Sequence, residues 1–120
     1  MQLNSELHGQ DIIVIVAAPR IDAVQAIEFK EKFRNLVVGS EGRVVMDLSA
    51  VNFVDSSGLG AIVASMKALG GARKLELCGL QGNVEKVFRL TRLDSVFRVH
   101  PSTAAARASI GTPDATSLAG

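Results

Sequence analysis

The sequence predicts a single α/β domain: a mixed, mostly parallel sheet of about five strands with about four helices, largely on one side of it. Apolar residues alternate along the chain between strand-like and helix-like spacing, in the order strand, strand, helix, strand, helix, strand, helix, strand, helix. Such alternation is typical of parallel strands joined by crossover helices. No internal repeat or linker divides the 120 residues. We therefore expect one domain over residues 1–110 and a flexible tail over 111–120.

The first half of the chain supplies two strands and one helix. We expect an edge strand over 2–8, a hairpin turn at 9–11 and a strand over 12–16, whose β-branched residues suit burial on both faces. Asp22 is the expected N-cap of the next helix. Its predicted buried face carries apolar residues at spacings of three and four: Ala23, Ala26, Phe29, Phe33 and Leu36.

The second half repeats the pattern. Residues 44–48 form the next core strand, and Leu59, Ile62, Val63, Met66 and Leu69 mark the buried face of the helix that follows. We expect a strand at 75–78 with one better-buried face, and a third helix capped by Asn83. A short strand over 96–99 and an alanine-rich helix over 102–110, capped by Ser102, complete the domain.

Composition narrows the function classes. Lys and Arg number 13 against 12 Asp and Glu, which argues against a sequence-independent grip on nucleic acid. The single cysteine, Cys78, excludes an intrachain disulfide, and the two histidines lie far apart, so no metal site or cofactor is predicted. No apolar run approaches the roughly 18 residues of a membrane span, and the polar start lacks a signal peptide, so we expect a cytoplasmic protein.

The most informative stretch is Asp55-Ser56-Ser57-Gly58, which lies between the strand over 44–48 and the following helix. In open α/β sheets, functional groups gather at the carboxyl ends of strands. A second strand-to-helix junction, residues 19–22, is expected at the same edge. Helix capping by Asp55 or Ser56 alone explains much of this composition.

Three chemical interpretations of the two serines differ in strength. A nucleophilic Ser57 lacks the glycine two positions before it and has no base that the sequence identifies. A P-loop is excluded, because no glycine-rich run ends in Lys-Ser or Lys-Thr. A phosphoacceptor fits better, because a helix N-terminus favours the added negative charge. Phosphorylation would then change the surface without unfolding the domain.

Residues 44–63, VVMDLSAVNFVDSSGLGAIV, resemble the signature of the STAS domain family, the fold of bacterial anti-sigma factor antagonists. The order of elements resembles the family over nearly all of residues 2–110. The junction at 19–22 is similar to the family's Gly-x-Leu/Ile-Asp turn, although Pro19 stands where glycine is usual.

The resemblance implies a partner switch. The unphosphorylated antagonist binds an anti-sigma factor that is also a serine kinase, and the sigma factor is released. The kinase then phosphorylates the second serine of the pair, here Ser57, and a serine phosphatase restores the free form. Asp22 and Asp55 match the acidic residues beside the acceptor, and Ser56 is its neighbour. The protein itself would be substrate and ligand, with no catalytic residues.

Apolar residues and glycines surround the acceptor. Gly58 and Gly60 would let a kinase approach the backbone closely. Phe53, Val54 and Leu59 are expected in the core unless exposed, in which case they are candidate partner contacts. The alternative function is a STAS docking subunit of a transport or sensory complex without sigma factor control. For the chain itself we expect a monomer or a weak homodimer.

Overall fold

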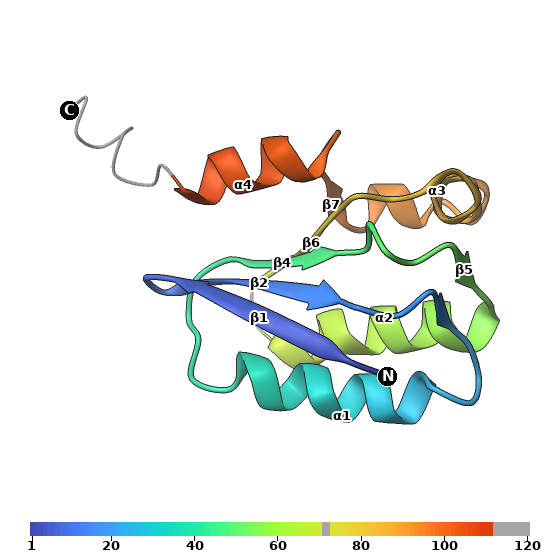
Figure 1. The fold of residues 1–120 in the computed structure, drawn as a ribbon, viewed down its shortest axis with the longest axis horizontal. Coiled ribbons are helices and arrows are strands. Elements are labelled where there is room, and N and C mark those ends of the chain that lie inside the picture. The colour runs from blue at the N-terminus through green and yellow to red at the C-terminus, as the bar shows by residue number, and fades with distance from the viewer. Residues whose placement is uncertain (71–72, 112–120) are drawn as a thin grey trace.

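The main sheet has five strands, which lie in the order β1 (Leu3–His8), β2 (Asp11–Val16), β4 (Val44–Asp47), β6 (Leu75–Cys78) and β7 (Arg98–Val99). The computed structural model describes residues 1–70 and 73–111 (Figure 1). β1 pairs antiparallel with β2, and the pairs β2–β4, β4–β6 and β6–β7 are parallel. The predicted mixed α/β sheet is therefore confirmed.

Two helices cover one face of this sheet. Helix α1 (Ala26–Val37) and helix α2 (Ser56–Leu69) lie side by side below the strands in Figure 1. Their apolar sides meet the α1-facing residues of β2, β4 and β6 in the main core. Phe29 and Phe33 are fully buried and stack with their ring centroids 6.4 Å apart. The helical spacing that predicted these two residues as core is confirmed.

Helix α4 (Thr103–Gly111) covers the opposite face, which corrects the expectation of helices largely on one side. Ala106 and Ile110 pack on Ile13, Val45 and Cys78 in a second, smaller apolar cluster. This cover also buries all four residues of β6, where the sequence predicted one better-buried face. The predicted cap is confirmed, because the Ser102 hydroxyl accepts a hydrogen bond from the Ala105 amide at 3.0 Å.

Helix α3 (Gly82–Leu90) differs from prediction at its start. Its N-cap is Gln81, whose side chain makes no capping hydrogen bond, so the expected cap by Asn83 is wrong. Phe88 contacts Phe97 edge-on at 6.0 Å between ring centroids. A 3₁₀ turn (Leu93–Ser95) follows, with Arg92 in the left-handed region at φ 62°, and it delays the last strand to Arg98. Of the tail expected over 111–120, Gly111 is the last residue of α4 and the rest lies outside the described residues.

Candidate functional site

A two-stranded ribbon holds the two strand-to-helix junctions together. β3 (Arg20–Ile21) pairs in parallel with β5 (Phe53–Val54), in the register Arg20 to Phe53 and Ile21 to Val54. The ribbon is extended by a hydrogen bond from the Asn52 amide to the Pro19 carbonyl at 2.8 Å. The sequence placed both junctions at one edge but did not predict these strands, because two residues are too short for a detectable period.

Asp55 is the N-cap of α2. Its backbone is extended, and its Oδ1 accepts a hydrogen bond from the Gly58 amide at 2.8 Å. The other carboxylate oxygen, Oδ2, accepts from the Ala23 amide at 3.2 Å. The Asp55 side chain therefore accepts a hydrogen bond from a free amide at the start of α2, and it also binds the loop that precedes α1.

Asp22 does not cap helix α1, contrary to prediction. Its Oδ1 accepts hydrogen bonds from the amides of Val24 and Gln25, at 3.1 and 3.3 Å, and closes a turn over 23–25. The helix begins only at Ala26, and Ala23, which was predicted to be inward, is exposed. The sequence could not separate the two outcomes, because an Asp side chain closes such turns as readily as it caps helices.

Ser56 and Ser57 open the first turn of α2, and both are exposed. Among residues 1–70 and 73–111, neither hydroxyl has a hydrogen-bond partner. The cap is made by Asp55, so neither hydroxyl is needed for it. Ser57 thus presents a free hydroxyl at a helix N-terminus, where amide groups and the helix dipole favour negative charge.

The two glycines beside Ser57 are in different environments. A side-chain carbon on Gly58 would stand 2.1 Å from the Ile21 carbonyl oxygen and 2.9 Å from Val54. Gly58 is buried, and its missing side chain permits close packing of α2 on the ribbon. The approach of a kinase to its backbone stays a prediction. Gly60 is exposed with nothing within 4 Å of that position, which leaves its surface open.

The three apolar residues near Ser57 that were candidate partner contacts differ in exposure. Phe53 is 43% exposed, and the Arg20 guanidinium lies over its ring at 4.7 Å from the centroid. Val54 is only 6% exposed, because its side of the ribbon faces the core beside Ile21, so it takes the expected core position and does not meet the condition for a candidate contact. Leu59 is half-buried against the core.

Two exposed apolar residues were not predicted. Val24 is 87% exposed in the turn before α1, and Ile27 is 66% exposed in the first turn of that helix. Val24 follows Ala23, whose amide is bonded to Asp55, so this apolar pair begins beside the cap of α2. Their position off the buried helical stripe was the available signal.

Neither histidine supports a nucleophilic Ser57. His8 Nε2 lies 3.5 Å from Glu6 on β1. His100 is buried, and its Nε2 contacts Glu76 Oε1 at 2.7 Å. No group of three His, Cys, Asp or Glu side chains that could hold a metal ion occurs in the described part of the chain. The two histidines are thus engaged elsewhere, which weakens the hydrolase interpretation.

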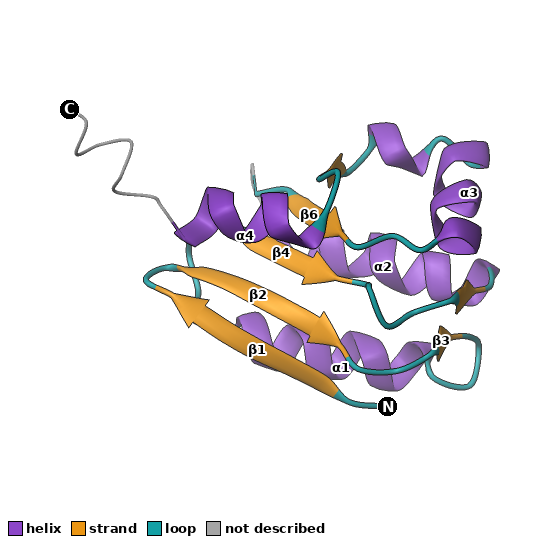
Figure 2. Cartoon of the chain, turned by 45° about the horizontal axis from the view of Figure 1, so that its top comes forward, coloured by secondary structure: helices purple, strands orange, loops and turns teal. Residues whose placement is uncertain are grey.

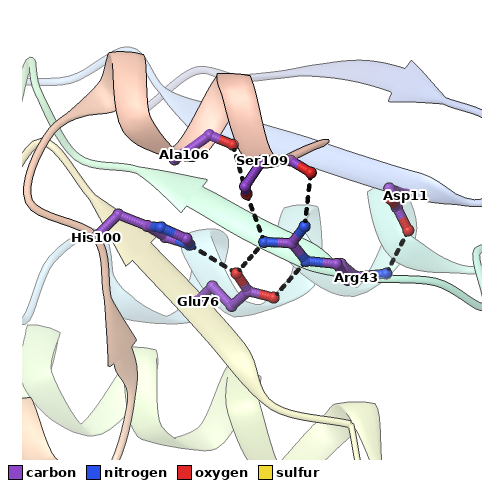
Figure 3. Close-up of polar contacts among 6 residues, drawn as sticks. All are labelled: Asp11, Arg43, Glu76, His100, Ala106 and Ser109. Atoms are coloured by element: carbon purple, nitrogen blue, oxygen red, sulfur yellow. Dashed lines mark hydrogen bonds and ion pairs between the residues drawn. The ribbon is translucent and has the colours of Figure 1, made fainter. Parts of the chain in front are cut away.

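A buried polar cluster lies on the α4 face of the sheet, where it joins the sheet to α4 (Figure 3). Glu76 is 5% exposed and receives hydrogen bonds from Arg43 Nε at 2.9 Å, Arg43 Nη2 at 2.7 Å and His100. Burial alone would raise the pKa of Glu76, but the bonds from Arg43 and His100 outweigh burial and hold the pKa below its ordinary value of 4.5. Arg43 also donates to the Ser109 carbonyl and hydroxyl, and so joins α4 to the sheet.

Helices long and apolar enough to cross a membrane are not found within residues 1–70 and 73–111.

The fold and the serine junction together define the family. The STAS domain profile matches residues 3–106, so this chain belongs to the STAS domain family. A Listeria monocytogenes protein named anti-sigma-B factor antagonist is 33% identical over 103 residues, which cover 82% of this chain and 90% of that protein. A Staphylococcus aureus protein of the same name is 26% identical over 105 residues, covering 86% of this chain and 97% of the relative.

Solved structures agree with this assignment. The crystal structure of an anti-sigma factor antagonist from Mycobacterium paratuberculosis superimposes with a TM-score of 0.79 at 28% identity. The superposition covers 91% of this chain and 92% of that one. The family predicted from residues 44–63 is confirmed.

Proposed function

We propose that this domain is an anti-sigma factor antagonist whose binding is switched off by phosphorylation of Ser57. The observation that carries the proposal is the Ser57 hydroxyl, which is exposed at the N-terminus of α2 and has no hydrogen-bond partner among the described residues. The names of the Listeria, Staphylococcus and Mycobacterium relatives support antagonism of an anti-sigma factor.

In this proposal, the unphosphorylated domain binds an anti-sigma factor that is also a serine kinase, in the cytoplasm, and so releases a sigma factor. The exposed apolar side chains near the cap of α2, Val24, Ile27 and Phe53, offer contact area to that partner. A serine phosphatase returns the phosphorylated protein to the binding form. The domain acts as substrate and ligand and not as a catalyst.

Phosphorylation would act locally. The phosphate adds between one and two negative charges and three acceptor oxygens. The fold tolerates them, because Asp55 already makes the cap and the amides of Ser56 and Ser57 stand at the positive end of the helix. Asp22 and Asp55 lie on the two junctions that the Ala23–Asp55 hydrogen bond joins, and Asp22 is paired with Arg20 at 3.0 Å, so the phosphate adds negative charge beside two carboxylates and one guanidinium. A partner adapted to the free hydroxyl would lose affinity.

The test compares binding of Ser57→Ala, Ser57→Asp and Ser56→Ala variants to the kinase that Ser57→Ala captures from its native cell. We expect Ser57→Ala to bind and to resist phosphorylation. Ser57→Asp should bind at least about tenfold more weakly, which corresponds to roughly 1.4 kcal/mol. Ser56→Ala, the control, should bind and accept phosphate like the wild type. Wild-type affinity in Ser57→Asp, or phosphorylation of Ser57→Ala, would contradict the proposal.

A further inference from the structure

The outer edge of β1 is the longer of the two edges of the sheet. β1 has six residues, whereas β7 at the other edge has only two. In Figure 2, no described segment lies on the outer side of β1, the side that faces away from β2. A strand edge of this kind presents unpaired backbone groups, and natural proteins usually shorten, charge or cover it. β7 is too short to offer another strand many backbone hydrogen bonds, so β1 is the edge open to pairing.

The register shows which backbone groups are free. The Ala17 amide donates to the Gln2 carbonyl at 2.9 Å, so residues of even number in β1 exchange hydrogen bonds with β2. The hydrogen bonds of β2 fit this pattern, because the Ile12 amide points away from β1 and donates to the Arg43 carbonyl. The amides and carbonyls of Leu3, Ser5 and Leu7 therefore point outward, and they have no partner in the described residues.

Three features that usually prevent pairing with another strand are missing from this edge. The strand Leu3–His8 contains no lysine and no proline, and its register with β2 has no bulge. Its one carboxylate, Glu6, lies on the α4 face, where Arg107 holds it at 2.6 Å. On the other face Leu7 is 71% exposed, and a groove of about 290 Å³ lies between it and the end of α1, lined also by Leu36 and by Val38, which is 72% exposed.

We propose that β1 pairs antiparallel with β1 of a second copy of this chain, with Ser5 opposite Ser5 on the two-fold axis. Residues opposite each other in an antiparallel pair share one face of the sheet. This register therefore places each exposed Leu7 against Leu3 of the second copy. The outward groups of Leu3, Ser5 and Leu7 then form three hydrogen-bonded pairs, each with two bonds.

The side chains of β1 favour this register, and they favour a second copy of this chain as the partner. On the α4 face, Asn4 comes opposite Glu6, and Gln2 opposite His8, so no like charges meet. A shift by two residues toward the hairpin would set Glu6 against Glu6 of the other copy, which is repulsive. A shift the other way leaves Leu7 without an opposing leucine and shortens the overlap. A self-complementary strand of this kind forms a closed dimer and not a filament.

The dimer surface is separate from the Ser57 site. The site is built from α2, β3, β5 and the turn before α1, and contains no residue of β1. The two sheets would merge across the axis, and both Ser57 hydroxyls would stay accessible. This inference therefore goes beyond the proposed function and stands or falls independently of it.

The first test is sedimentation velocity over a range of protein concentrations. We expect a concentration-dependent dimer for the wild type and for Ser5→Ala. Ser5→Pro, which removes the central outward amide of each copy while sparing the ladder to β2, should be monomeric. Leu7→Lys should raise the dimer dissociation constant at least about tenfold. Leu90→Lys is the matched control, since Leu90 is equally exposed at 69% but lies on α3, and it should dimerise like the wild type.

The second test measures the register. Opposed Ser5 residues would have their Cα atoms about 5.5 Å apart, within the range of a disulfide, whereas Asn4 and its symmetry mate would be about 8 Å apart. We expect Ser5→Cys to form a covalent dimer under mild oxidation and Asn4→Cys not to form one. Native Cys78 is buried and does not interfere. A wild type that stays monomeric at all concentrations, a dimer that survives both Ser5→Pro and Leu7→Lys, or equal cross-linking at both cysteines would overturn the proposal.

Discussion

The Asp55 carboxylate accepts a hydrogen bond from the Ala23 amide at 3.2 Å, across 32 positions of the sequence. The same carboxylate caps α2 through the Gly58 amide. The loop before α1 and the start of α2 are therefore one structural unit. Ser57 lies on that unit, and its hydroxyl has no partner within residues 1–70 and 73–111.

Replacing Asp55 with alanine should destabilise the domain by about 1–2 kcal/mol, because the cap of α2 and the bond to Ala23 are lost together. Ser56→Ala should leave the unfolding free energy unchanged, because the Ser56 hydroxyl has no partner in the part of the chain that the structure describes. Urea unfolding of both variants checks this. A larger loss in Ser56→Ala than in Asp55→Ala would show that the cap has been assigned to the wrong residue.

The two glycines of the motif should respond in opposite directions. Gly58→Ala places a carbon 2.1 Å from the Ile21 carbonyl oxygen, a backbone atom that cannot rotate away, and should cost at least about 2 kcal/mol. Gly60→Ala meets nothing within 4 Å in a helix interior and should stabilise the domain by about 0.5–1 kcal/mol. Thermal unfolding measures both. Similar melting temperatures for the two variants would contradict the packing described for α2.

Glu76→Gln should destabilise the domain by roughly 3 kcal/mol at neutral pH, because it leaves the Arg43 guanidinium without its buried counter-charge and weakens the contact with His100. The matched control is Glu85→Gln, which breaks only an exposed pair with Arg89 and should have little effect. Urea unfolding at pH 7 separates the two variants.

The same carboxylate predicts a pH dependence. The pKa of Glu76 is lowered in the folded domain, so its contribution is present above the ordinary pKa of 4.5 and is lost as the pH falls through the folded value. Between pH 7 and pH 3 the wild type should therefore lose more unfolding free energy than Glu76→Gln. Parallel curves for the two proteins would mean that Glu76 is not held ionised by its partners.

Alanine variants of Phe53 and Val54 should differ in their effects on partner binding and on the free energy of unfolding. Val54 is buried, so Val54→Ala should lower the unfolding free energy by about 1–2 kcal/mol. Phe53 is exposed beside Arg20, so Phe53→Ala should cost less than about 1 kcal/mol of stability. Under the proposed function, Phe53→Ala should weaken binding of the anti-sigma factor. Calorimetry of binding and unfolding for both variants decides whether Phe53 is a contact.

The sequence predicted the sheet because its strands and helices carry strong apolar periods. Phe29 and Phe33 follow a helical stripe, and both are fully buried. The motif around Ser57 was equally readable, since Asp55 is the cap that its residue type suggested. These features depend on neighbours along the chain, which the sequence displays directly.

What the sequence did not show depends on contacts between distant segments. Asp22 closes a turn instead of capping α1, the role that was predicted for it. The Asp55 carboxylate accepts a hydrogen bond from the Ala23 amide, and the chain turns before it becomes helical. The strand over 75–78 was expected to bury one face better than the other, yet α4, Arg43 and His100 bury Glu76 as well. Val54 is buried because β3 and β5 pair, and neither strand has a period of its own.

Intact mass followed by peptide mapping of the protein purified from its native cell tests the phosphorylation switch. We expect a fraction carrying one phosphate, located on Ser57 and absent from Ser57→Ala. A phosphate on Ser56 or elsewhere, or no phosphate under any growth condition, would contradict the switch. In the second case a constitutive docking subunit would become the better description of this domain.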